Sequence, residues 1–222
     1  MLSILTVIHI TSGAIGLLTG FLAILLRKGD QQHRRVGNIY ICAMLTLGVT
    51  GAVVALVRDI PLSMMNALVI CYFVLSSLST IRNPIHGTNA FDKLLMVSAW
   101  LITAGFLYFI VQVTRSATGQ LGGFGPGAYI AFGSVMLCAA IADVRYLLKS
   151  GLSRKQRLVR HLWRMLFPLF MASAAFFLGQ ASFFPQSIRA IEILIIPVAF
   201  VILSLLYWTA KVSFNKDLTA RI

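Results

Sequence analysis

The sequence predicts an all-α, polytopic membrane bundle of seven transmembrane helices, with its N-terminus outside and its C-terminus in the cytoplasm. Of its 222 residues, 59% are hydrophobic and only 11% are charged. The mean hydropathy of +0.88 also lies above the range of soluble domains. A helix needs about 20 apolar residues to cross the hydrocarbon core, so seven crossings fill the chain. We therefore expect residues 1–222 to form a single integral membrane domain.

The predicted spans are apolar runs bounded by charge, glycine or proline. Between the third and the fourth run lies the segment 82–89, whose Asn-Pro and His-Gly steps are typical of a turn. The remaining connections are also short, which favours antiparallel hairpins. The runs cover residues 2–26, 37–57, 61–81, 91–113, 127–148, 161–184 and 191–212.

The orientation follows from the basic residues, because short cytoplasmic loops retain Lys and Arg. With the N-terminus outside, 16 of the 19 basic residues lie on the inner side and only Arg58, Arg115 and Arg189 on the outer side. This asymmetry accounts for the net charge of +13 and predicts attraction to a bilayer with anionic headgroups. Nucleic acid is not needed as a partner. The sequence leaves open whether the chain forms a homo-oligomer or joins a larger membrane complex.

Polar side chains at membrane depth are costly, so they are the best pointers to function. In the first run His9, Ser12, Gly13, Gly16 and Gly20 share one helix face. The Gly16-x-x-x-Gly20 spacing permits close helix approach. We favour the interpretation of His9 as a histidine that is hydrogen-bonded across a helix contact, over the alternative of a ligand-binding histidine.

Asp143 and Arg164 are predicted to meet across the fifth and sixth spans. They lie at similar distances from the middle of the loop that joins these spans, so an antiparallel hairpin brings them to the same depth. Such a pair could be a structural clamp. With His161 beside it, the pair could equally belong to a binding or proton-transfer site.

A histidine falls at the inner bend of each of the three helical hairpins: His33, His86 and His161. Three imidazoles at one depth could ligate a metal, and two on facing helices could ligate haem b. His33 and His161 are the metal candidates. Neighbouring arginines suit haem propionates, phosphates or lipid headgroups alike.

Several short motifs resemble an uncharacterised family of predicted bacterial membrane proteins, the domain of unknown function 2306. The resemblance implies a location in the bacterial inner (cytoplasmic) membrane and brings no established activity. The segment around His86 has no counterpart in it. The motifs are His9-x-x-x-Gly13, His33-Arg34-x-x-Gly37-x-x-Tyr40, Asp143-x-Arg145 and Arg160-His161-Leu162-Trp163-Arg164-Met165.

Three functions of different class remain open at the level of sequence. The first is a protein that binds or transports a small anion, a lipid headgroup or a proton through a polar site facing the cytoplasm. The second is a redox subunit that binds haem b or a quinone through His33 and His161. The third is an accessory or assembly protein without a ligand. The binding site expected for the first is His33, Arg34, Asp143, His161 and Arg164.

Overall fold

The computed structural model describes residues 2–85 and 87–214, and in this part of the chain it contains seven long helices and no strand. Each is long and apolar enough to cross a membrane. The prediction of an all-α, seven-span protein is confirmed. Predictions that rest on His86, Lys216 or Arg221 lie outside the described residues. The helices are α1 (Leu2–Leu25), α2 (Gln31–Val57), α3 (Pro61–Arg82), α4 (Ala90–Arg115), α5 (Pro126–Leu148), α6 (Arg154–Ser173) and α7 (Ile191–Phe214).

Two helices begin earlier than the apolar runs, because polar side chains cap their first turns. Helix α2 begins at Gln31, where the Asp30 carboxylate accepts a hydrogen bond from the Gln31 amide at 2.7 Å. Helix α6 begins at Arg154 behind a capping box formed by Ser153 and Gln156. The basic residues that follow both caps are therefore helical and held in fixed directions. The α-helical part of α6 ends at Ser173, where the sequence predicted a continuous span to residue 184.

A short π-helix (Ala174–Leu178) extends α6, and two 3₁₀ turns (Ala181–Phe183 and Gln186–Ile188) lead from it to α7. Pro61 and Pro126 occupy the first positions of α3 and α5, where the missing amide hydrogen costs nothing. The helix ends are thus set by local sequence.

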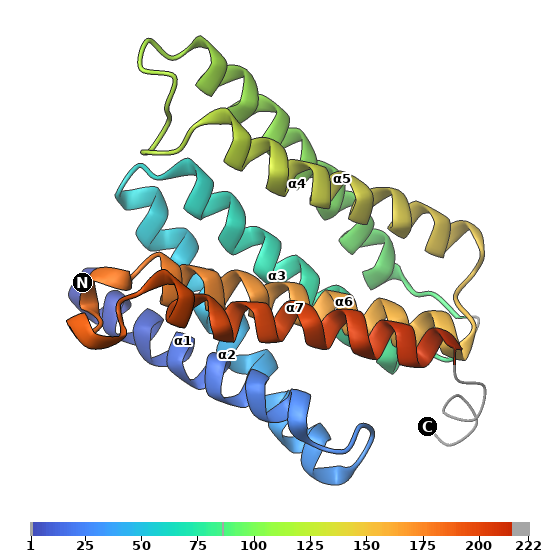
Figure 1. The fold of residues 1–222 in the computed structure, drawn as a ribbon. Coiled ribbons are helices and arrows are strands. Elements are labelled where there is room, and N and C mark those ends of the chain that lie inside the picture. Colours follow the sequence, from blue (N-terminus) through green and yellow to red (C-terminus); the bar gives the residue numbers. More distant parts are fainter. Residues whose placement is uncertain (1, 86, 215–222) are drawn as a thin grey trace.

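Four helices, α1, α2, α3 and α6, pack around one another in that order, so that α2 and α6 lie on a diagonal. The α4–α5 hairpin packs on the side of α3, and α7 packs on α6 (Figure 1). Helix α3 is the most buried span, while α7 is the most exposed. Large apolar side chains cover much of the outer surface of the helices, as a lipid-facing surface requires.

The glycine face of α1 makes the close contacts that its spacing predicted. A Cβ atom placed on Gly16 would lie 2.9 Å from Met44 Sδ, and one on Gly20 would lie 2.5 Å from Leu169 Cδ1. His9 Nδ1 lies 3.2 Å from both the Leu47 carbonyl and Thr50 Oγ1 of α2. The interpretation of His9 as a hydrogen-bonded contact residue is confirmed.

The loops α1–α2, α3–α4 and α5–α6 lie at the same end of the molecule, opposite the N-terminus (Figure 1). We call this end, which carries the basic clusters around residues 27–35 and 145–164, the basic end. It is the end that the charge asymmetry assigns to the cytoplasm.

Candidate functional site

The centre of the candidate site is Asp143 on α5, which is 2% exposed. Its Oδ1 accepts from Arg164 Nη2 at 2.6 Å and from Arg160 Nη2 at 2.8 Å, and its Oδ2 accepts from the Tyr72 hydroxyl at 2.6 Å. The predicted pair of Asp143 and Arg164 is confirmed. The structure adds Arg160 and Tyr72 as further partners of the same carboxylate.

Arg164 is fully buried, and its two Nη atoms donate to protein acceptors, while its Nε has no hydrogen-bond partner among the described residues. Its Nη1 donates to the Tyr72 hydroxyl at 2.7 Å and to Ser76 Oγ at 2.6 Å, and its Nη2 also reaches the Ala139 carbonyl at 3.4 Å. The guanidinium carbon lies 4.9 Å from the centre of the Trp163 ring, a favourable cation–π distance. The acid beside Arg164 is the predicted Asp143, and an external anion at this arginine stays a prediction.

Arg160 lies one turn before Arg164 and links the same carboxylate to α3. Its Nε donates to Thr80 Oγ1 at 2.8 Å, and its guanidinium lies 4.5 Å from the centre of the Tyr146 ring. Asp143 is thus surrounded by two cations and one hydroxyl, so a charged carboxylate is well compensated here.

The contribution of α3 was not predicted from the sequence. Tyr72, Ser76 and Thr80 are spaced four residues apart and present one polar stripe to α6. The run Ser76-Ser77-Leu78-Ser79-Thr80 in an apolar helix was the signal that could have indicated it. Small hydroxyl residues are common at contacts between membrane helices, which is why the run draws little attention on its own.

The two histidines predicted as metal candidates each have one ring nitrogen fixed by the protein. His33 Nδ1 lies 3.2 Å from the Ala23 carbonyl at the end of α1. His161 Nδ1 lies 2.8 Å from Ser77 Oγ on α3. Arg34 is exposed and makes no side-chain hydrogen bond or ion pair with the described residues.

A second buried carboxylate, Asp92, fastens α4 to α3. It is 4% exposed and accepts from Ser79 Oγ at 2.6 Å, from Asn83 Nδ2 at 2.6 Å and from the Asn89 amide at 2.9 Å. Within residues 2–85 and 87–214, it has no cationic partner within 4 Å, since the ion pairs found there all involve Asp143. Neutral donors alone therefore stabilise this carboxylate.

A groove of about 550 Å³ opens between α5 and α6 at the basic end. Among the described residues that line it are the basic residues Arg145, Lys149, Lys155 and Arg160, and no acid. Tyr146, Trp163 and Val159 contribute aromatic and apolar surface. Lys155 Nζ donates to the Ser213 carbonyl of α7 at the rim. The groove therefore combines basic side chains with aromatic and apolar surface.

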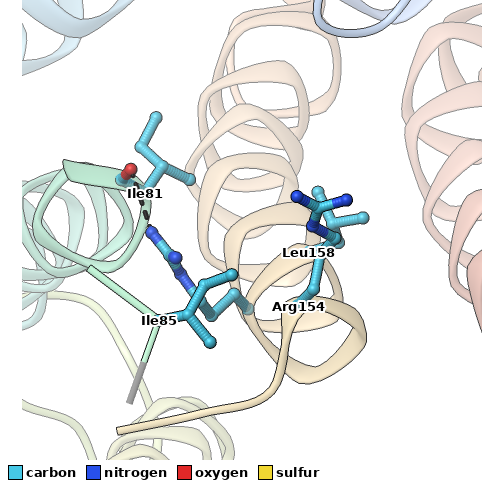
Figure 2. A pocket seen from close by; sticks show the side chains of 5 residues that line it. Ile81, Ile85, Arg154 and Leu158 are labelled. Carbon is cyan, nitrogen blue, oxygen red and sulfur yellow. Dashed lines mark hydrogen bonds between the residues drawn. The ribbon is translucent and has the colours of Figure 1, made fainter. Parts of the chain in front are cut away.

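A smaller hollow of about 300 Å³ lies between the end of α3 and the start of α6, beside Ile81, Ile85, Arg154 and Leu158 (Figure 2). Its fifth lining residue, Arg157, is committed to the α3 terminus: Nε donates to the Thr80 carbonyl at 3.0 Å and Nη2 to the Ile81 carbonyl at 3.1 Å. We read this hollow as part of the helix cap.

Of the five predicted site residues, the structure therefore joins Asp143 and Arg164 in one buried network. It places His161 about one turn before Arg164, with its Nδ1 2.8 Å from Ser77 Oγ, and leaves Arg34 on the surface. The groove cations Arg145 and Lys149 were not predicted as site residues.

Fold and site together define a seven-helix, multi-pass membrane protein with a polar network buried near one end. Comparison with protein-family models, curated proteins and solved structures gives no match. The resemblance to the domain of unknown function 2306 stays a prediction.

Proposed function

We propose that this protein binds the phosphate-bearing headgroup of an anionic membrane lipid in the groove between α5 and α6. The observation that carries the proposal is the set of four basic side chains around the groove, with no acid among its described lining residues. Phosphate oxygens accept hydrogen bonds from both Arg and Lys, and the basic end is where the positive-inside rule places the anionic inner leaflet of a bacterial membrane.

The groove suits a lipid better than a free anion. Its aromatic and apolar lining, with Trp163 and Val159, offers nothing to a small hydrated ion but can contact glycerol and the first methylenes of an acyl chain. Arg145 and Lys149 are exposed and can move toward a headgroup. Lys155 is also exposed and is held at the Ser213 carbonyl of α7. Arg160 at the base is held by Asp143 and Thr80, so it supplies a fixed positive charge.

Binding of purified protein to defined lipids tests the proposal. Phosphatidylglycerol should bind detergent-solubilised protein in native mass spectrometry, while phosphatidylcholine and inorganic phosphate should compete poorly. The double variant Arg145→Gln with Lys149→Gln should lose about 2 kcal/mol of affinity, or about 30-fold, at about 1 kcal/mol for each cation near the headgroup.

A matched variant, Arg27→Gln with Arg35→Gln, removes two exposed charges from the same end but outside the groove and should leave the affinity unchanged. Equal losses in both double variants would show a diffuse charge effect and overturn the groove as the site. Tight binding of inorganic phosphate would overturn the choice of a lipid.

A further inference from the structure

The interior of the four-helix bundle α1–α2–α3–α6 contains a feature that the lipid groove does not use. Helices α2 and α6 are diagonal and run in the same direction, from the basic end outward. Cofactors of helical bundles are held in such interiors by side chains from facing helices. His33 on α2 and His161 on α6 are in this position.

One hydrogen bond fixes the register of the two helices. The Tyr40 hydroxyl of α2 donates to the Met165 carbonyl of α6 at 2.8 Å. His33 precedes Tyr40 by two turns and His161 precedes Met165 by one turn, so both histidines lie on the faces that meet there. Their depths differ by about 5 Å at 1.5 Å of rise per residue.

The hydrogen bonds also decide which nitrogen of each ring is available. A carbonyl can only accept, so the contact of His33 Nδ1 with the Ala23 carbonyl places the proton on Nδ1. Ser77 Oγ donates to the His161 carbonyl at 3.2 Å, so it accepts from His161 Nδ1. In the neutral rings, each Nε2 atom is therefore unprotonated and carries a lone pair that can bind a metal. This is how metal-binding histidines are held, with Nδ1–H fixed by a protein acceptor.

We propose that His33 and His161 ligate one haem iron through their Nε2 atoms. No group of three or more His, Cys, Asp or Glu among the described residues could hold a metal ion, so a bare ion would lack ligands. Haem iron carries four porphyrin nitrogens and needs only two axial ligands from the protein. The exposed Arg34, next to His33 in the sequence, is a cation that can pair with a haem propionate.

The test is spectroscopic and uses the full chain. Protein produced with a supply of haem precursor, or reconstituted with haemin after purification, should show a Soret band and about one iron per chain, as expected for a bis-histidine haem. His33→Ala and His161→Ala should lose the band. Ser77→Ala should weaken haem affinity about 10- to 100-fold, because it removes the acceptor that orients His161.

His9→Gln is the matched control, since His9 Nδ1 also contacts a backbone carbonyl at 3.2 Å. His9 is remote from the proposed site, because it lies about 24 Å along α1 from Leu25, the residue at which α1 ends at the basic end. It should keep the haem. Should an alanine variant fail to fold by thermal melting, His161→Met retains a ligand and should shift the band. Absence of haem uptake by folded wild-type protein, or full uptake by the folded double variant His33→Ala with His161→Ala, would overturn the proposal. Copper or zinc bound in place of haem would overturn the choice of haem.

Discussion

Asp143 Oδ1 lies 2.6 Å from Arg164 Nη2, and this contact joins α5 to α6 although the two helices are otherwise held together mainly through α3. The same oxygen also accepts from Arg160 at 2.8 Å. One carboxylate thus compensates two guanidinium groups that are each less than a tenth exposed. The excess positive charge is spread over hydroxyl and carbonyl acceptors, chiefly on α3.

This arrangement predicts unequal effects of removing its members. Asp143→Asn leaves two buried cations without a carboxylate and should cost about 3–5 kcal/mol of stability. Arg164→Gln should cost less, because Asp143 keeps Arg160 and Tyr72 as partners. Thermal unfolding of the detergent-solubilised variants, followed by circular dichroism, measures the difference.

The double variant Asp143→Asn with Arg164→Gln should be milder than the sum of the two single variants, as coupled residues require. Glu192→Gln, at an exposed acid of α7, serves as the control and should leave the melting temperature unchanged. Strict additivity, or a larger effect of Arg164→Gln than of Asp143→Asn, would contradict the network as described.

The sequence could predict that Asp143 and Arg164 lie at the same depth. It could not predict which residues of other helices contact them. Position along an antiparallel hairpin follows from counting residues, whereas the partners of Arg160 depend on how α3 is inserted beside α6. That insertion is decided by tertiary packing. The capped first turns of α2 and α6 were missed for a related reason: charged residues there end the apolar run but not the helix.

A second prediction compares Gly20, on the glycine face of α1, with Gly37 of α2. Gly20→Ala places a methyl group against Leu169 and the Tyr40 ring and should destabilise the bundle by about 1–3 kcal/mol. Gly37→Ala meets no atom within 4 Å, so it should be neutral or stabilise α2 by up to about 1 kcal/mol. Melting temperatures of the two variants decide the matter. A gain of similar size in both variants would show that helix propensity, rather than close approach, sets the effect, and a similar loss in both would contradict the open space beside Gly37.

A third prediction concerns Asp92, the buried acid that depends on neutral donors. Asp92→Ala removes the acceptor of Ser79, Asn83 and the Asn89 amide at once and should loosen α4 from α3. Leaving buried donors unsatisfied costs about 1–3 kcal/mol each. Asp30→Ala removes an exposed cap of α2 and should have a smaller effect. Hydrogen exchange should locate the Asp92→Ala change in the first turns of α4 and the last turn of α3. Faster exchange spread evenly over all helices would argue against this local role.

The last prediction concerns orientation. Among the described residues, the basic clusters are at one end of the bundle and the loops α2–α3, α4–α5 and α6–α7 at the other (Figure 1). Because the positive-inside rule assigns the basic end to the cytoplasm, Gln32 should face inward and Thr118 outward. Both side chains are exposed, so each accepts a cysteine without disturbing the core. The three native cysteines, which lie in α2, α3 and α5, are first replaced by alanine to give a silent background.

In that background, Thr118→Cys should react with a membrane-impermeant maleimide on intact cells, while Gln32→Cys should react only after the membrane is opened. The maleimide meets an exposed thiol in both variants, so a difference between them reports the side of the membrane rather than burial. Labelling of Gln32→Cys alone in intact cells would reverse the assigned orientation. It would also place the groove between α5 and α6, together with the His33 and His161 pair, on the outer side, where the anionic inner leaflet could not supply the lipid.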